Sequence, residues 1–352
     1  MASMRRGLAA GLAAAIVLAA LPEISLDAQA RNTTLTSVAG IKVGHYTLPN
    51  APTGCTVILA EAGATAGVDV RGMAPASAET DLLNPVNLVQ QIHAITLSGR
   101  SAFGLDARSG VMKYLEEKQI GFPFGKAHVP IVPAASLFDL GVGDPMIRPT
   151  ADCGYQAARS ATDAPVVEGS VGAGAGATIG KAAGLGRALK SGVGSASITL
   201  PNGLTVAALV VVNAFGDVID PATGLVVAGV RAQDGKGFAD ARKLLRAGAV
   251  NFGGTGNTTL GVIATNATLT KTEATRVSEM AHDGFARAIA PIHTPVDGDL
   301  IFTLATQARA ASGDAGVIGA LAAEVMADAI LRAARQATGV QGIPALRDLP
   351  RP

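Results

Sequence analysis

Short apolar runs bounded by glycine and proline recur along the chain, between longer segments with helical spacing. Runs of this kind are typical of buried strands, and they occur at residues 41–43, 56–60, 67–70, 94–97, 177–182, 196–200, 204–212, 258–265 and 301–304. Apolar stripes typical of helices occur at 102–119, 149–161, 241–249, 270–290 and 317–336. Strands and helices do not alternate strictly. This favours sheets stacked between helix layers over a doubly wound parallel sheet.

Two of these segments carry more information than the others. Residues 204–212 contain the uniformly apolar run VAALVVV, which predicts a strand buried on both faces. Residues 258–265 (TTLGVIAT) predict a buried strand that begins directly after the glycine-rich segment 251–256. Thr270 and Glu273 have the spacing of a capping box, so a helix should begin there. The proline-rich tail from residue 342 is expected to be loose.

The first thirty residues have the pattern of a secretory signal. Arg5 and Arg6 precede an apolar stretch of about fourteen residues, and Ala28-Gln29-Ala30 forms a small-x-small cleavage site. The stretch is shorter than the roughly 20 residues of a spanning helix. We therefore expect a signal peptide at 1–30, cleavage after Ala30, and a periplasmic or secreted mature protein. The arginine pair leaves the export route open.

The composition excludes several classes of partner. The 352 residues carry a net charge of +1, and aromatic residues make up 3%. Neither a nucleic-acid footprint nor an aromatic stacking surface is indicated, and no membrane partner is expected after signal removal. The two cysteines, Cys55 and Cys153, could pair in an exported protein or lie in the core. Their spacing does not indicate a metal site.

Familiar site motifs fail on spacing. The glycine run that ends at Lys181 has Ala175 where a phosphate-binding loop needs its first glycine, and Ala182 follows the lysine. Ser101 lacks the GxSxG surroundings of a hydrolase serine. The histidines form no pair at i, i+4, so neither catalytic zinc nor another cofactor is expected. We interpret them as packing or surface residues: His45, His93, His128, His282 and His293.

The junction between the glycine-rich segment and the following strand is the strongest candidate for chemistry. There Asn257 precedes Thr258, which stands at the start of the predicted strand. The Thr258 hydroxyl can attack the Asn257 carbonyl to give an ester that water opens. The product carries a free α-amine, with an ordinary pKa of roughly 7.7–8.0, on the nucleophile itself. That amine can serve as its local base.

Polar residues elsewhere could complete such a site. Asp297 and Asp299 stand two residues apart at the start of a predicted strand, so both can face one site. Two close carboxylates differ in pKa, and one can hold a proton while the other binds the α-ammonium. Asn213 ends the apolar run 204–212 and is a candidate oxyanion donor. Lys181 is either a solvated charge or a cation that tunes the nucleophile.

At these residues the chain resembles the self-processing family of L-aminopeptidase/D-amidase-esterases, β-aminopeptidases and the nylon-oligomer hydrolase. The likeness extends over about residues 40–307. It is carried by the segments IKVGHYT (41–47), GVDVRGMAP (67–75), LSGRSAFGLDA (97–107), VPIVPAASLFDL (129–140), GAGATIGKA (174–182), VVVNAFGDV (210–218), NTTLGVIATNA (257–267) and ARAIAPIHTPVDGDLIF (286–302).

The resemblance implies a fold and a set of roles. The fold is a four-layer αββα sandwich of the N-terminal-nucleophile type. The precursor is cut between Asn257 and Thr258 into an α chain (31–257) and a β chain (258–352), which belong to one domain and assemble into homo-oligomers of αβ units. The implied catalytic residues are Thr258 as nucleophile, the acidic pair Asp297 and Asp299, Lys181, and Asn213 at the oxyanion.

Two differences from other members indicate which branch of the family the chain resembles most. Phe138 stands where some members carry an active-site tyrosine, so that hydroxyl is missing. The β-aminopeptidases have a serine nucleophile and a serine–glycine–glutamate motif, whereas this chain has Thr258 and Asp-Gly-Asp at 297–299. The chain is therefore more similar to the nylon-hydrolase, threonine-type branch. We expect an aminopeptidase or amidase that acts on small peptides or other linear amides.

Two alternatives come from other classes. An acyltransferase of the ornithine acetyltransferase type would share the architecture, but its KGxGM-type cleavage segment ending in Ala-Thr is missing. A non-catalytic binding homologue would not need Thr258 together with its polar partners. The sequence does not distinguish α-peptides, β-peptides, D-amino acid amides, nylon-like oligomers or cell-wall fragments as substrates.

The signal-peptide prediction can be checked directly. When the full chain is expressed in a bacterium, the exported protein should begin at Arg31, as read by N-terminal sequencing of the periplasmic or culture fraction. Replacing Ala28 and Ala30 with bulky residues should leave the leader attached, because the signal peptidase site needs small residues. An exported protein that keeps residues 1–30 would contradict the prediction.

Overall fold

One long strand, β2 (Gly54–Val70), joins the two sheets on which the chain is built. In the computed structural model, which describes residues 32–250, 252, 256–309, 313–340 and 342–350, the first part of β2 pairs with β1 and β4. Its last part, residues 65–70, pairs with β16 of the other sheet. The two apolar runs 56–60 and 67–70, predicted as separate strands, are therefore parts of one strand.

Each sheet has a simple strand order. The first runs β1-β2-β4-β7-β3 and contains β1 (Lys42–Thr47), β4 (Ile92–Ser98), β7 (Ala134–Ser136) and β3 (Ala76–Ala78). The second runs β10-β11-β14-β16-β2 and contains β10 (Val193–Thr199), β11 (Thr205–Val211), β14 (Leu260–Thr265) and β16 (Leu300–Ala305). Most neighbours are antiparallel, but β4 and β7 are parallel, and so are β14 and β16. The shared direction of β14 and β16 positions the site.

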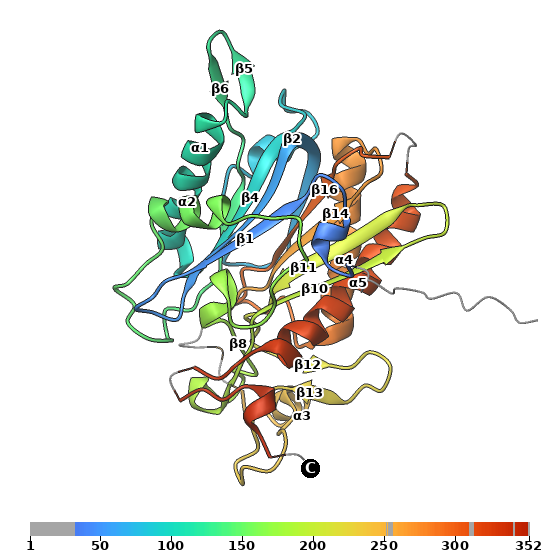
Figure 1. Cartoon of the computed structure of the whole chain (residues 1–352). Coiled ribbons are helices and arrows are strands. Elements are labelled where there is room, and N and C mark those ends of the chain that lie inside the picture. Colours follow the sequence, from blue (N-terminus) through green and yellow to red (C-terminus); the bar gives the residue numbers. More distant parts are fainter. Residues whose placement is uncertain (1–31, 251, 253–255, 310–312, 341, 351–352) are drawn as a thin grey trace, which may run out of the picture. The chain divides into compact units, whose positions relative to one another are not determined.

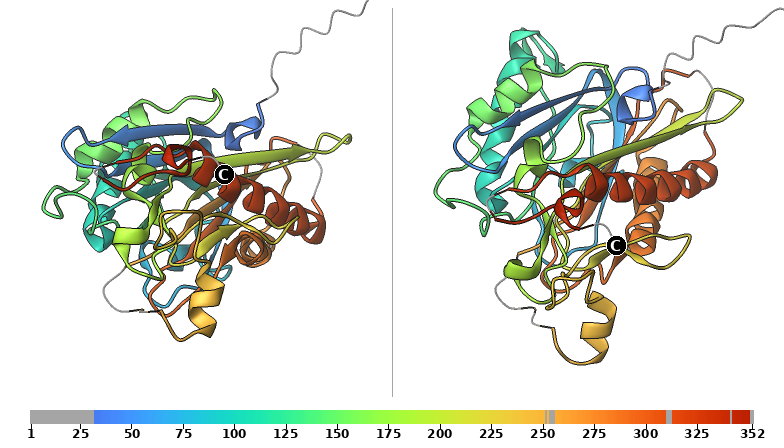
Figure 2. Two further views of the ribbon diagram at one scale, coloured as in Figure 1. Left: turned by 90° about the horizontal axis from the view of Figure 1, so that it is seen from below. Right: turned by 60° about the horizontal axis from the view of Figure 1, so that its bottom comes forward.

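Helices cover the outer face of each sheet. Helices α1 (Ala107–Glu117) and α2 (Ala151–Arg159) pack on the first sheet, and α4 (Lys271–Ala288) and α5 (Ala315–Gln336) pack on the second (Figure 1). Figure 2 shows the two helix pairs, teal to green and orange to red, on opposite sides of the strands. Separate hydrophobic clusters fill the three interfaces between these four layers. The predicted αββα sandwich is confirmed.

Strand β11 is buried on both faces, as its uniform apolarity predicts. Alternate side chains of a strand point to opposite faces. Val206, Ala208 and Val210 belong to the core under α4 and α5, whereas Leu209 and Val211 belong to the core between the sheets. Full burial of each such valine or leucine contributes roughly 1.5–3 kcal/mol, so this strand is firmly held close to the site.

The two long helices of the second layer begin at side-chain caps. The Thr270 hydroxyl accepts the Glu273 amide, and the Glu273 carboxylate accepts the Thr270 amide, which confirms the predicted capping box. The Asp314 carboxylate accepts two amides of the first turn of α5. Among the helices of the described segments, none is both long and apolar enough to cross a membrane.

The remaining elements are short. The strands are β5 (Phe122–Phe124), β6 (Ala127–Val129), β8 (Thr178–Ile179), β9 (Leu189–Lys190), β12 (Asp217–Ile219), β13 (Val226–Ala228) and β15 (Ile289–Ala290). The helical turns are α3 (Ala241–Arg246), η1 (Leu35–Ser37), η2 (Asp81–Leu83), η3 (Ser101–Asp106), η4 (Gly172–Gly176), η5 (Leu185–Arg187) and η6 (Leu346–Asp348).

Three expectations differ from the structure. Of the predicted strand 177–182 only the two residues of β8 pair, because the chain turns at Gly180 with a positive φ of 69°. Regular pairing of the predicted strand 258–265 begins at Leu260. The tail is not loose over residues 342–350, since Pro344 accepts the Lys190 amide at 2.8 Å and Ala345 is buried. The predicted signal peptide at 1–30 lies outside the described residues.

A disulfide joins Cys55 in β2 to Cys153 in α2, so both possibilities that the sequence left open for these cysteines, pairing and a place in the core, hold together. Both residues are buried in the cluster between the first sheet and its helices. The bond fastens the outer helix layer to the strand that connects the sheets. It closes a loop with a sequence separation of 98 residues.

We expect this disulfide to stabilise the fold by roughly 4 kcal/mol, because closing a long loop removes conformations from the unfolded chain. Urea unfolding of the oxidised protein should show a higher free energy of unfolding than the same protein with a reductant. A Cys55→Ala/Cys153→Ala variant is the control, and the reductant should not change its stability. Equal stability of the oxidised and reduced wild type would contradict this role.

Candidate active site

Three neighbouring strands of the second sheet bring one residue each to a common row. Leu260 of β14 is level with Val211 of the antiparallel β11 and with Leu300 of the parallel β16. Two residues further toward the same edge of the sheet lie Asn213 (after Val211), Thr258 (before Leu260) and Gly298 (before Leu300). The Thr258 amide donates to the Asn213 carbonyl at 2.8 Å, and the Gly298 amide donates to the Asn257 carbonyl at 3.1 Å. Strand register therefore assembles this part of the site.

The Asn257–Thr258 peptide bond lies at the centre of the row. The Thr258 hydroxyl donates to the carbonyl oxygen of Asn257, the residue before it. The same oxygen accepts the Gly298 amide, so two donors polarise one carbonyl. A Cβ at Gly298 would lie 2.8 Å from the Thr258 hydroxyl oxygen and 2.5 Å from the Ala74 carbonyl. Only glycine lets this backbone approach the threonine so closely.

The two predicted carboxylates are both fully buried at the start of β16 and have different partners. Asp299 accepts the Thr259 amide at 2.6 Å through Oδ1, and it accepts both the amide and the Nδ1 of His293 through Oδ2. Asp297 accepts the Thr294 amide at 2.6 Å. Burial, reinforced by the charge of Asp299, raises the pKa of Asp297 to about 6.

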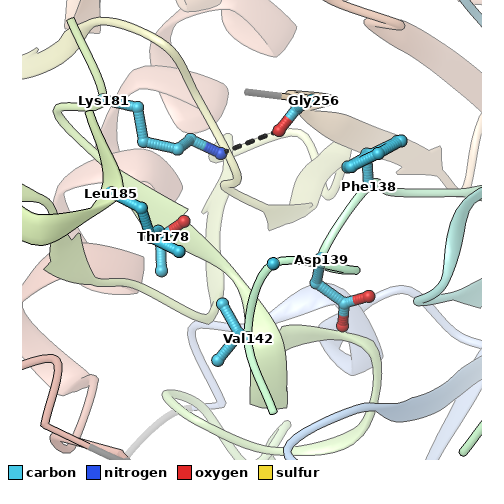
Figure 3. A pocket seen from close by; sticks show the side chains of 8 residues that line it. Phe138, Asp139, Val142, Thr178, Lys181, Leu185 and Gly256 are labelled. Carbon is cyan, nitrogen blue, oxygen red and sulfur yellow. Dashed lines mark hydrogen bonds between the residues drawn. The ribbon is translucent and has the colours of Figure 1, made fainter. Parts of the chain in front are cut away.

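Lys181 and Asn213 are connected directly by a hydrogen bond. The Lys181 ammonium donates to the Asn213 side-chain oxygen at 2.8 Å and to the Gly256 carbonyl at 3.2 Å (Figure 3). Lys181 is buried, and the loss of hydration lowers its pKa to about 7, although Asp297, Asp139 and Asp299 oppose the shift. The structure therefore excludes the solvated-charge interpretation of Lys181. An amine with this pKa is partly neutral near pH 7.

Among the described residues, the hydrogen bonds of the Asn213 side chain do not include one to the Asn257 carbonyl. Its amide nitrogen donates to the Phe138 carbonyl at 2.9 Å, and its oxygen also accepts the Thr178 amide. The Gly298 amide contacts the Asn257 carbonyl oxygen instead. The oxyanion role of Asn213 stays a prediction. Phe138 contributes its backbone carbonyl, which needs no tyrosine hydroxyl.

An open pocket of ≈ 540 Å³ lies beside Thr258. Its wall is largely apolar and includes Ala74, Ala76, Phe138, Phe252, Pro295 and Val296. A smaller cavity of ≈ 50 Å³ is lined by Lys181 and Asp139 and shares Phe138 and Gly256 with the first (Figure 3). The Phe138 ring lies against Gly256, where a side chain would clash with it. Phe138 and Gly256 thus form a wall that both cavities share.

Sequence reasoning missed Gly298 and two histidines. His293 contacts Asp299 at 2.8 Å, and its other ring nitrogen contacts His282 at 3.2 Å. The sequence spacing of the histidines shows only that they match no zinc motif, and it predicts both rings as packing or surface residues. His293 stands six residues before Asp299 in one polar segment, and this proximity is the signal that could have indicated it.

The comparisons with known proteins agree with this fold and arrangement. The model of peptidase family S58 matches residues 33–346. An uncharacterized aminopeptidase of Mycobacterium tuberculosis is 44% identical, covering 90% of this chain and 97% of the relative. A 6-aminohexanoate-oligomer endohydrolase of a Kocuria species is 30% identical, covering 90% of each chain.

Two solved structures show the same fold. A β-aminopeptidase of a Burkholderia species has a TM-score of 0.64 at 22% identity and covers 90% of both chains. The L-aminopeptidase D-Ala-esterase/amidase of Ochrobactrum anthropi, described as a variant of the N-terminal-nucleophile hydrolase fold, has a TM-score of 0.65 at 17% identity. That match covers 89% of this chain and 91% of the other.

The fold is that of the N-terminal-nucleophile hydrolases, and the relatives define the class of protein as an amide hydrolase. The chain belongs to peptidase family S58. The family resemblance inferred from the sequence is confirmed, and so is the expectation of an enzyme that acts on amide bonds.

Proposed function

We propose that the chain cleaves its own Asn257–Thr258 bond and then hydrolyses amides through an acyl-enzyme on Thr258. The observation that supports this is the contact between the Thr258 hydroxyl and the carbonyl oxygen of the preceding residue. That oxygen also accepts the Gly298 amide. A nucleophile and an oxyanion donor therefore already lie at the bond to be cut.

The self-cleavage proceeds in two balanced steps. The Thr258 oxygen attacks the Asn257 carbonyl carbon, the C–N bond breaks, and the hydroxyl proton ends on the departing amine. Water then opens the ester to give the Asn257 carboxylate and a free α-amine on Thr258. We propose that neutral Lys181 relays the proton, because it lies 3.2 Å from the Gly256 carbonyl, next to the scissile residue.

Hydrolysis of a substrate repeats this chemistry on a second carbonyl. The Thr258 hydroxyl attacks the amide, and the new α-amine, with an ordinary pKa of roughly 7.7–8.0, carries the proton to the leaving amine. Asp297 and Asp299 orient that amine. Departure of Gly256 removes one acceptor of the Lys181 ammonium. We propose that Lys181 and Asn213 then face the substrate, and that Asn213 and backbone amides stabilise its oxyanion.

The pocket beside Thr258 limits the acyl part of the substrate. No charged side chain stands among the described residues that line it, so it fits an uncharged, largely apolar acyl group of a linear amide. We further propose the α chain 31–257, the β chain 258–352, homo-oligomers of αβ units and a periplasmic or secreted location. The Cys55–Cys153 disulfide supports the location, since such bonds persist in oxidising compartments.

A pair of variants at the nucleophile tests self-cleavage. Thr258→Val keeps the shape of the side chain but has no hydroxyl, so it should remain one chain on a denaturing gel and lose amide hydrolysis by at least about 10³-fold. Thr258→Ser keeps a hydroxyl and should still divide into two pieces. If the valine variant is cut at the same bond, the proposed nucleophile is wrong.

The pH dependence of self-cleavage tests Lys181. Because burial lowers its pKa to about 7, the neutral fraction grows as the pH rises from 6 to 8, and the rate of cleavage should grow with it. The rate can be followed by gel after refolding of the precursor. Lys181→Met has no base and Lys181→Arg stays protonated, so both should slow cleavage by roughly 10²-fold. An arginine variant that processes at the normal rate would show that the lysine acts only as a cation.

A further inference from the structure

A line of polar groups leads from Asp299 away from the nucleophile. His293 Nδ1 lies 2.8 Å from Asp299 Oδ2, and His293 Nε2 lies 3.2 Å from His282 Nδ1. His282 Nε2 lies 3.2 Å from the Asp69 carbonyl. These residues come from the segment before β16, from α4 and from β2. Three elements thus meet in one hydrogen-bonded line.

The number of protons in this line follows from its two ends. A carboxylate oxygen and a backbone carbonyl oxygen both accept only. The three hydrogen bonds of the line need three protons in total, one for each bond. Two neutral imidazoles supply only two protons. One additional proton must therefore reside in the line, on a ring or on Asp299.

The surroundings decide where this proton lies. His282 is completely buried in α4, and burial lowers its pKa to about 3, so its ring stays neutral. Asp299 accepts the Thr259 amide through Oδ1 and the His293 amide through Oδ2, so both of its oxygens already act as acceptors. His293 keeps a side-chain exposure of 20% and lies against that carboxylate. The other charged groups of the line, Asp69 and Arg71, form an ion pair with each other at 2.7 Å.

We propose that His293 is a positioning residue, an imidazolium that holds Asp299 ionised and oriented while His282 fixes the ring from behind. Its Nδ1–H donates a hydrogen bond to Asp299, and its Nε2–H donates one to His282 Nδ1. His282 then has a single proton, on Nε2, which it donates to Asp69. With Asp299 ionised, all three hydrogen bonds are satisfied in this arrangement and in no arrangement of two neutral rings.

The proposal assigns different roles to the two carboxylates, and this consequence rests on the proposed function. Asp299 is the permanent anion that holds the α-ammonium of Thr258 after cleavage. Asp297 has no cationic ring beside it, and its pKa is raised to about 6, so it is the member of the pair that exchanges protons. A histidine that does not touch the substrate therefore decides which of the two carboxylates stays ionised and which exchanges protons.

A matched pair of variants tests the positioning. His293 has a positive φ of 55°, which asparagine and aspartate accept more readily than other residues. His293→Asn places an N–H donor at the position of Nδ1, whereas His293→Asp has the same shape but only accepts. We expect His293→Asn to keep kcat within about 10-fold, and His293→Asp to lose roughly 10²-fold in kcat with little change in KM.

His128→Asn is the control. It is the same substitution, but His128 lies on β6, away from the site. Thermal unfolding of all variants separates loss of the fold from loss of position. Nearly equal activity of the His293→Asn and His293→Asp variants would overturn the proposal.

Nuclear magnetic resonance of the ring nitrogens tests the proton count without catalysis. In uncut Thr258→Val protein labelled with ¹⁵N-histidine at pH 7, His293 should carry protons on both nitrogens and His282 on Nε2 alone. A neutral His293 ring would overturn the proposal. If the wild type neither cleaves itself nor hydrolyses amides, the proposed function fails, but this measurement still decides the state of His293.

Discussion

The site depends on the register between β14 and its two neighbours. A shift of one residue in a strand turns its side chains to the opposite face. A slip of β14 against β16 would therefore take the Gly298 amide away from the Asn257 carbonyl and turn the Thr258 side chain to the opposite face of the sheet. Burial of β11 and β14 between two apolar cores holds the register. The same packing that stabilises the sandwich thus holds Thr258, the proposed nucleophile, beside Gly298.

Burial also determines the charges around that bond. The Lys181 amine and the carboxylates of Asp297 and Asp299 have almost no contact with water. Each ionised group must therefore be balanced by its neighbours rather than by hydration. The lysine loses part of its proton affinity and Asp297 gains some. Their pKa values of about 7 and about 6 lie near neutrality, where proton transfer in either direction is easiest.

The sequence predicted the four layers and the five proposed site residues, because apolar strands, a capping box and several motifs occur in order. It could not predict that β2 passes through both sheets, since a curved strand has no separate pattern. It also could not place Gly298 or His293 in the site. Their roles depend on the parallel pairing of β14 with β16 and on the contact of α4 with the site, and such contacts arise only in three dimensions.

The proposed mechanism requires that Thr258 has a free α-amine and forms the covalent intermediate through its side-chain hydroxyl. The direct test is mass spectrometry of the purified protein, acid-quenched during turnover of a slow amide or ester substrate. The account predicts a fragment whose N-terminal residue is Thr258, with the acyl group of the substrate attached to that residue. An intact chain through position 258 that nevertheless turns over substrate, or an acyl group on another residue, would contradict it.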